Sequence, residues 1–386
     1  MLRKLIAAAV VVGFVVAPAG AQAQVHRSAY HQYRIDTVAT GLVNPWSLAF
    51  LPGGDMLITE RPGRLRIFRG GKLLEKPVEG IPEVMSRGQG GLLDVVPHPN
   101  FASNRLLYLS YAKPIGDSSA ATTAVIRGRF ENDRLTGIEE IFLAQTRGAP
   151  GHFGSRLAFD RDGFLFITVG DRVVPPSGNL EAHPAQDLTN HQGTINRIHD
   201  DGRVPTDNPF IGREGAKPEI WTYGHRNPQA LAIHPTTGDV WATEHGPQGG
   251  DELNLIRKGL NYGWPVIGFG VNYRTGSAIH SGTTRQGMES PVNVWVPSIG
   301  VSGMVIYTGD KFPEWKGSVF AGGLVGEQLA RLTLNGQRAE VAEVLARRVG
   351  RIRDVRQGPD GLIYLAIDNR EGAPTPIVRL VPAGGS

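Results

Sequence analysis

A short apolar run, a turn of Gly, Asp or Pro, and a second run rich in aromatic and β-branched residues recur about six times along this chain. Four clear copies lie at residues 48–60, 157–171, 231–244 and 355–368, and two looser copies lie at residues 93–111 and 304–322. Such runs, separated by turn residues, predict β-hairpins. No segment has the periodicity of a long amphipathic helix, so the pattern predicts an all-β protein.

The spacing of the repeats favours one architecture. Six copies leave about 60 residues for each repeat, enough for a four-stranded blade and one sizeable loop. We therefore predict a six-bladed β-propeller of four-stranded antiparallel blades over residues 24–386, as a single domain. The ring is expected to close where the early strand at 33–39 pairs with the last blade around 377–381. A β-helix or a β-sandwich built from the same hairpins is the alternative.

The N-terminus has the pattern of a secretory signal peptide over residues 1–23. Arg3 and Lys4 precede an apolar run at 5–16, which is too short to span a bilayer and is followed by small residues. We expect cleavage after Ala21 or Ala23, a periplasmic or secreted protein, and no stable membrane insertion.

The composition excludes cysteine chemistry and argues against nucleic-acid binding. The chain has no cysteine, which excludes disulfides, thiolate metal sites and thiol nucleophiles. Its formal charge is +4, or +2 without Arg3 and Lys4, and its basic residues are scattered, so nucleic acid is not an expected partner. Fifty-one glycines and 27 prolines agree with a chain of many tight turns.

Polar clusters lie at the ends of the predicted hairpins. They occupy residues 88–91, 151–154, 224–228, 244–247 with 250–252, and 351–354. Hairpin ends of a propeller meet at the mouth of its channel, so five such clusters together predict a polar site for an anionic ligand.

These segments also carry a resemblance to a known family. Seven segments, spread over essentially the whole mature chain, resemble the soluble PQQ-dependent aldose sugar dehydrogenases of the glucose/sorbosone dehydrogenase type. They are GQGGLLDVV, GHFGSRLAFD, IWTYGHRNPQALA, TEHGPQGGDELNLI, NYGWP, SGMVIYTGDKFPEW and RIRDVRQGPDGLIYL. The resemblance implies PQQ and Ca²⁺ as cofactors and oxidation of an aldose at C1 to a lactone. A quinone or another electron acceptor would complete the reaction. The particular aldose, the acceptor and the oligomeric state stay open.

The resemblance assigns cofactor-binding residues. PQQ carries three carboxylates and an electrophilic quinone, so its pocket needs cations and hydrogen-bond donors. Arg351 and Arg353 alternate on a predicted strand and are expected to share a face. The alternative is that this face is exposed to solvent and binds no ligand. The residues that match the family's cofactor positions are Gln89, Arg226, Asn227, Gly323, Leu324, Val325, Arg351 and Arg353, with Gln89 close to the substrate. Val325 replaces a lysine that the family often carries, a loss for which Gln328 or a water would have to compensate.

His152 matches the family's catalytic base. A neutral imidazole can take the proton of the C1 hydroxyl while hydride moves to C5 of the quinone. A histidine that caps a turn is the alternative. Gly151 stands where the glucose-oxidising branch has an acidic residue, so the sequence does not identify the group that orients His152.

Metal ligands follow from the resemblance alone. The main-chain carbonyls of Gly246 and Pro247 match those that hold the activating Ca²⁺ together with PQQ, and such ligands suit a hard cation. Glu252 and Tyr262 match ligands of a second, structural Ca²⁺. As bare residues, Glu252 and Tyr262 are better explained as ordinary polar groups of a loop.

Two other functions fit a six-bladed propeller. A Ca²⁺-dependent lactonase or other hydrolase would need an acidic channel, whereas the clusters here offer three arginines and few carboxylates. A propeller that binds a carbohydrate without catalysis is the other alternative. A nicotinamide enzyme is not expected, because no glycine-rich dinucleotide fingerprint follows a strand.

Overall fold

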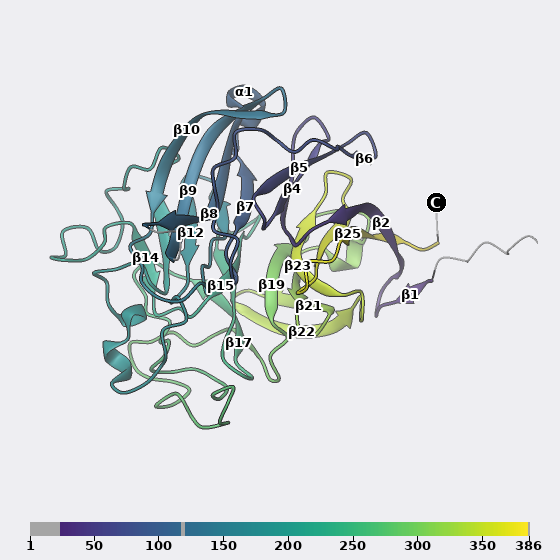
Figure 1. Ribbon diagram of the computed structural model, residues 1–386. Coiled ribbons are helices and arrows are strands. Elements are labelled where there is room, and N and C mark those ends of the chain that lie inside the picture. The colour runs from purple at the N-terminus through teal and green to yellow at the C-terminus, as the bar shows by residue number, and fades with distance from the viewer. Residues whose placement is uncertain (1–23, 117–119, 385–386) are drawn as a thin grey trace, which may run out of the picture.

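The computed structural model describes residues 24–116 and 120–384 and is built almost entirely from antiparallel strands (Figure 1). Strands account for 45% of the residues and helices for 4%, and the sheets form a six-bladed β-propeller, which confirms the predicted fold class. The predicted signal peptide lies outside the described residues. Within residues 24–116 and 120–384, no helix is long and apolar enough to cross a membrane.

Each of the first five blades is a sheet of four strands in chain order, and the sixth is completed by strands from the N-terminus. Blade 1 contains β3 (Pro45–Phe50), β4 (Met56–Glu60), β5 (Arg64–Arg69) and β6 (Lys72–Leu73); blade 2 contains β7 (Leu92–Pro97), β8 (Leu106–Ile115), β9 (Ala120–Glu131) and β10 (Arg134–Leu143). Blade 3 contains β11 (Leu157–Phe159), β12 (Leu165–Val169), β13 (Thr194–Ile198) and β14 (Ile220–Tyr223); blade 4 contains β15 (Pro228–Ile233), β16 (Val240–Glu244), β17 (Asp251–Ile256) and β18 (Asn293–Trp295).

The last two blades follow the same plan. Blade 5 contains β19 (Val301–Ile306), β20 (Val319–Gly323), β21 (Gln328–Asn335) and β22 (Arg338–Leu345). Blade 6 contains β23 (Arg351–Gln357), β24 (Ile363–Asp368), β25 (Thr375–Pro382) and β2 (Gln32–Leu42), with β1 (His26–Arg27) at its edge. The helical segments are short: α1 (Phe101–Asn104) and the 3-10 turns Leu180–Ala182, Pro184–Gln186 and Pro313–Trp315.

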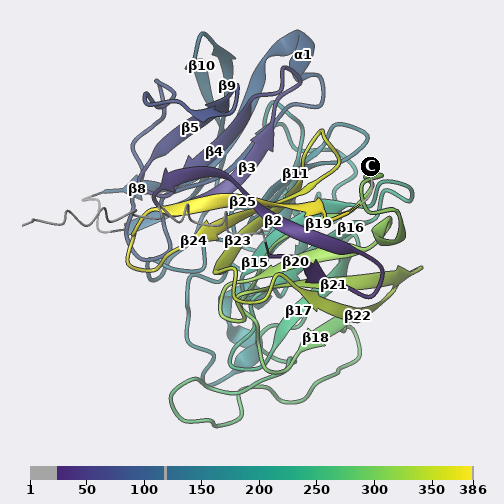
Figure 2. The same cartoon turned by 90° about the vertical axis from the view of Figure 1, so that its right-hand side faces the viewer.

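All six predicted hairpins are present, as the first two strands of the six blades. The predicted ring closure is also confirmed, because β2 pairs with β25 from Tyr33 opposite Pro382 to Leu42 opposite Thr375. Figure 2 shows the N-terminal strand beside the C-terminal one. The first strands of the blades contact one another in the order β3, β7, β11, β15, β19, β23 and back to β3, which closes the inner ring.

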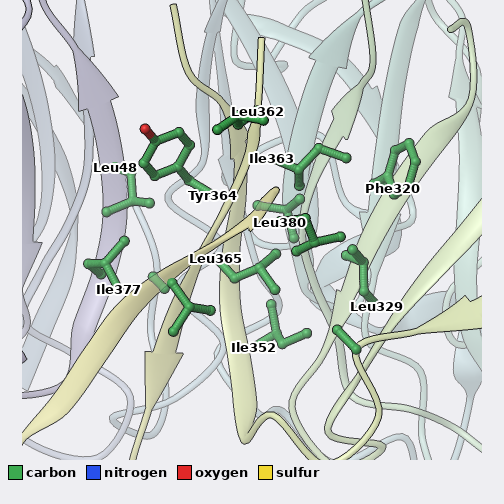
Figure 3. Packing of buried hydrophobic residues seen from close by; sticks show 14 of the residues in the cluster. Leu48, Phe320, Leu329, Ile352, Leu362, Ile363, Tyr364, Leu365, Ile377 and Leu380 are labelled. Atoms are coloured by element: carbon green, nitrogen blue, oxygen red, sulfur yellow. The ribbon is translucent and has the colours of Figure 1, made fainter. Parts of the chain in front are cut away.

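The hydrophobic core is distributed between neighbouring blades. One cluster joins Leu48 of blade 1, Phe320 and Leu329 of blade 5, and Ile352 and Leu365 of blade 6, all of them buried (Figure 3). Burying each of these side chains contributes roughly 1.5–3 kcal/mol relative to exposure. The framework is therefore stabilised between the blades, and the loops at the blade ends are free to form a site.

Candidate active site

A cavity of about 940 Å³ opens at one end of the channel and receives residues from all six blades. Its volume lies within the range of small-molecule sites. The cationic residues that line it are Arg61, Arg351, Arg353 and Arg370, the acidic ones are Asp251 and Asp368, and the apolar walls include Trp46, Leu93, Phe153 and Leu324. Four of the five predicted blade-end clusters contribute to this cavity, through Gln89, Phe153, His245 with Asp251, and Arg353, whereas the cluster at 224–228 does not line it. His152 is not itself among the lining residues, although its neighbour Phe153 is.

β-Bulges turn side chains toward this cavity. The register between the first two strands shifts in five of the six blades, including the steps Pro45/Ser47, Leu92/Val95, Pro228/Ala230 and Ile352/Asp354. At these four steps a residue inside the bulge lines the cavity, namely Trp46, Leu93, Gln229 and Arg353. A bulge re-aims a side chain at the end of a strand, so the repeated bulge supplies the inner lining.

The arginines of blade 6 have spare donors. Nη1 of Arg353 donates to Oε1 of Gln229 at 3.1 Å, and Nη1 of Arg351 donates to the Leu324 carbonyl at 2.9 Å. The buried Nε atoms of both arginines have no hydrogen-bond partner among the described residues, and neither has Nε of Arg61. Burial and the nearby positive charges lower the pKa of Arg353 to about 10. An anion in the cavity would satisfy these donors and offset their charge.

His152 is held by a buried carboxylate. Its Nδ1 lies 2.6 Å from Oδ1 of Asp171, and the side chains of the two residues are 9% and 1% exposed. The main-chain N–H of His152 donates to Oε1 of Gln89 at 2.9 Å. Asp171 lies just beyond β12, in the same blade as β11, whose N-terminal approach carries His152. Asp171 is therefore the group that orients His152, which the sequence alone did not identify.

Electrostatics set the protonation of this pair. Burial lowers the pKa of His152, and the charge of Arg226 lowers it further, against the opposing effect of Asp171. Burial alone would raise the pKa of Asp171, but the charge and hydrogen bond of His152 outweigh it and hold that pKa below its usual value. The carboxylate can only accept, so Nδ1 of His152 carries the hydrogen and Nε2 is the free base.

A second, much smaller cavity adjoins Arg226. It is lined by residues that include Gly246, Pro247, Glu252 and Tyr262. Nη1 of Arg226 donates to the Gly246 carbonyl at 2.7 Å, and the Pro247 carbonyl accepts from Ser298 Oγ at 3.1 Å. The Gly246 carbonyl, which the resemblance assigns to Ca²⁺, is thus hydrogen-bonded to the guanidinium of Arg226.

Two acidic residues, the buried Glu244 and the partly buried Glu252, lie directly opposite each other on β16 and β17. Glu244 pairs with His225 at 2.7 Å, whereas burial raises the pKa of Glu252 and the charge of Glu244 raises it further. The hydroxyl of Tyr262 donates to the Leu255 carbonyl at 2.5 Å and accepts from the main-chain N–H of Arg257 at 2.9 Å, so it is already engaged within the chain. No group of three or more His, Asp or Glu side chains in the described part of the chain is arranged for a metal ion.

The structure places the expected cofactor residues in three groups. Those that line the large cavity are Gln89, Leu324, Val325, Arg351 and Arg353. Arg226 lines the small cavity with the four expected metal ligands. Asn227 is fully buried, with Oδ1 accepting from the main chain of Gly154 at 3.2 Å, and Gly323 is buried at the end of β20. Gln328 does not line the large cavity, but Arg370 does, on the same side as Arg351.

Several residues of the site escaped the sequence analysis, namely Arg61, Asp171, Gln229, Trp264 and Arg370. Three of them occupy equivalent positions in the sequence repeat. Arg61, Asp171 and Arg370 each follow the second strand of a blade by one or two residues, the position that His245 holds in blade 4. Aligning the repeats would have marked this position as the mouth of the channel. Gln229 and Trp264 carry no such signal.

Comparison with known proteins agrees with this geometry. The family model described as glucose / sorbosone dehydrogenase matches residues 42–379. The aldose sugar dehydrogenase YliI of Escherichia coli is 44% identical over 88% of this chain and 91% of its own length. The structure of the soluble aldose sugar dehydrogenase of Escherichia coli in its apo form superposes with a TM-score of 0.85 at 41% identity, covering 91% of this chain and all of the other. The PQQ-bound aldose sugar dehydrogenase of Streptomyces coelicolor superposes with a TM-score of 0.72 at 28% identity, covering 90% of this chain and 98% of the other.

The family model spans all six blades, from the end of β2 to β25, and therefore every strand that carries a residue of the two cavities. The six-bladed β-propeller and the arginine-lined cavity beside a buried histidine–carboxylate pair are consistent with that match. On this evidence the chain belongs to the glucose/sorbosone dehydrogenase family.

Proposed function

We propose that this protein is a PQQ-dependent aldose sugar dehydrogenase that oxidises the C1 hydroxyl of aldoses to lactones, with His152 as the general base. The observation that carries the proposal is the contact of 2.6 Å between His152 and Asp171, beside a cavity in which the buried Nε atoms of Arg61, Arg351 and Arg353 have no hydrogen-bond partner among the described residues. The N-terminal pattern supports export, so we place the reaction in the periplasm or outside the cell. A quinone or another acceptor would then remove the electrons.

The residues of the large cavity fit PQQ. Its three carboxylates need cations, and the buried Nε atoms of Arg351 and Arg353 in this cavity, and of Arg226 in the small one, have no partner among the described residues. Gln89 offers an amide group, and Leu324 and Val325 form part of the wall, whereas Asn227 and Gly323 would act from behind it. Val325 brings no charge, and Arg370 on the same cavity is the residue that compensates for it.

The chain's own residues perform the proton transfer. When bound, PQQ supplies an electrophilic quinone that accepts a hydride. Nε2 of His152 takes the proton of the C1 hydroxyl, and Asp171 stabilises the imidazolium that forms. Gln89, whose Oε1 accepts from the main-chain N–H of His152, would lie beside the sugar. The apolar side chains of Trp46, Leu93 and Phe153, which line the cavity, would help to exclude water from the reaction.

The calcium sites are part of the proposal. Ca²⁺ at the carbonyls of Gly246 and Pro247 requires Arg226 to turn from the Gly246 carbonyl toward the cofactor carboxylates. A second Ca²⁺ held by Glu252 and the main chain of Tyr262 would offset the repulsion between Glu252 and Glu244. The small cavity that these residues line has room for about one ion or water.

The decisive experiment is an absorbance titration of the purified apo-protein with PQQ, with and without Ca²⁺. We expect saturable PQQ binding that Ca²⁺ strengthens, and oxidation of aldoses through an artificial acceptor only when both are added. NAD should not replace PQQ. Sugar oxidation with NAD alone would refute the proposal, lactone hydrolysis with Ca²⁺ alone would favour the hydrolase, and carbohydrate binding without any PQQ binding would favour the non-enzymatic propeller.

The pH dependence of the reaction should report His152. Because burial lowers its pKa below the usual 6.5, the imidazole stays neutral and active at pH values where an exposed histidine is already protonated. We expect kcat/KM to be constant above about pH 6.5 and to fall only below that value. Steady-state rates at fixed ionic strength, with PQQ and Ca²⁺ saturating at each pH, check this. An acid limb centred above pH 7 would contradict the assignment.

A further inference from the structure

The side chain of Trp264 touches the histidine–carboxylate pair from another blade. Its indole Nε1 donates to Oδ2 of Asp171 at 2.8 Å, while Oδ1 of Asp171 contacts His152 at 2.6 Å. Trp264 belongs to the segment between β17 and β18 of blade 4, whereas the other two residues belong to blade 3. Trp264 is 5% exposed, so the three groups form one buried hydrogen-bonded chain.

We propose that Trp264 is a positioning residue: its indole N–H fixes the carboxylate of Asp171 so that the opposite oxygen is presented to His152. Trp264 acts only through Asp171. The inference rests on the proposed function in one respect, namely that His152 is the base.

The physical reason is the freedom of a carboxylate. The terminal torsion of an aspartate is broad and roughly two-fold, so a single partner does not define its plane. Asp171 has donors on both oxygens: Oδ1 accepts from the main chain of Val173 at 2.9 Å as well as from His152, and Oδ2 accepts from Trp264. Removing the indole N–H leaves one buried oxygen without this donor and frees the carboxylate to rotate.

Trp264 is itself held rigidly. Its main-chain N–H donates to the Gly224 carbonyl at 2.8 Å, and its carbonyl accepts from Nε2 of Gln186 at 2.7 Å. The guanidinium of Arg226 lies 5.2 Å from the centre of the indole ring. Trp264 also lines the small cavity beside Gly246 and Glu252, so it connects that cavity to His152.

Other charged groups also act on His152. Asp171, Arg226 and Arg172 influence its titration, and its own charge influences His245. A change at Trp264 leaves these charges in place. A change in the Nδ1–H resonance or in the pKa of His152 in a Trp264 variant therefore reports a change in the position or basicity of Asp171.

The first test uses the apo-protein and needs no cofactor. A short Nδ1–H hydrogen bond to a carboxylate gives a strongly downfield proton resonance, which His152→Gln and Asp171→Asn assign by abolishing it. We expect Trp264→Phe to shift this resonance upfield or broaden it. Trp241→Phe is the matched control, because Trp241 is buried in β16 of the same blade and its indole nitrogen has no hydrogen-bond partner among the described residues.

The second test uses the enzyme loaded with PQQ and Ca²⁺. We expect Trp264→Phe to lower kcat about 10- to 30-fold, the scale of one charge-assisted hydrogen bond, with KM for the sugar and PQQ affinity within about twofold. The acid limb of kcat/KM should move upward, because a carboxylate with fewer donors stabilises the imidazolium more. Replacing Trp264 with benzothienylalanine, which keeps the shape and lacks the N–H, should give the same result if Trp264→Phe does not fold.

The proposed function and the positioning role of Trp264 can fail independently. If the wild-type protein shows no PQQ-dependent activity, the proposed function is wrong, and the proton resonance of the apo-protein still decides whether Trp264 positions Asp171. If that resonance and kcat are both unchanged in the benzothienylalanine variant, the positioning role is overturned. Equal losses in Trp264→Phe and Trp241→Phe would also overturn it, because they would reflect packing alone.

Discussion

Replacing His152 with alanine should lower turnover about 10²- to 10⁴-fold with PQQ and Ca²⁺ saturating, because the C1 hydroxyl then keeps its proton while hydride leaves. PQQ affinity should change little, since the imidazole is hydrogen-bonded to Asp171 and the proposed cofactor partners are the arginines. Turnover under single-substrate saturation and PQQ binding by absorbance measure the two effects separately.

The backbone of His152 requires a second variant. Its φ of +46° lies in the left-handed region, which alanine tolerates poorly and asparagine tolerates better. His152→Asn should therefore fold normally and be as inactive as His152→Ala. His98→Ala, at the turn after β7, is the control that keeps activity. Near-normal turnover with PQQ bound would contradict the assignment, and loss of the circular dichroism signal in both His152 variants would make His152 a structural turn residue.

Arg353→Ala should weaken PQQ binding by roughly 2 to 4 kcal/mol, about 30- to 1,000-fold in Kd, because it removes a charged partner of a carboxylate in a partly dry cavity. Excess PQQ should restore much of the rate, since Arg353 contributes to binding more than to proton transfer. Asp368, which contacts Arg353 at 3.5 Å, retains the amide of Asn44 at 3.0 Å and is not left without a partner.

The control for Arg353 is Arg69→Ala. Arg69 is an exposed arginine that pairs with Asp55 and Asp133 and lies away from the large cavity. Its replacement should leave the Kd for PQQ unchanged. An unchanged Kd in Arg353→Ala would place that residue outside the cofactor site, and a loss that excess PQQ cannot relieve would point to misfolding.

The fold could be predicted because its information is local. Each hairpin is a pair of apolar runs around a turn, as at 48–60 and 355–368, and the number and spacing of the copies determine how many blades the ring holds. Pairing of β2 with β25 was predictable because both termini carry strands that would otherwise remain unpaired edges.

The site could be predicted in part for the same reason. Polar clusters at hairpin ends must lie at an end of the channel, and Arg351 and Arg353 do line the same cavity. The reason that Arg353 faces the cavity is not strand alternation alone, because a bulge between Ile352 and Asp354 sets the direction of its side chain. Neither the bulge nor its recurrence in four other blades could be deduced from the alternation of apolar residues.

The all-β class, the six hairpins, the closure of the ring and the gathering of polar residues at one end of the channel follow from periodicity and turn chemistry, and could therefore be predicted without coordinates. The contacts of Asp171 with His152 and with Trp264 could not. These residues are 19 and 93 positions apart and belong to different loops. The first contact joins two loops of blade 3 and the second depends on how blade 4 packs against blade 3, and no local pattern in the sequence encodes either distance.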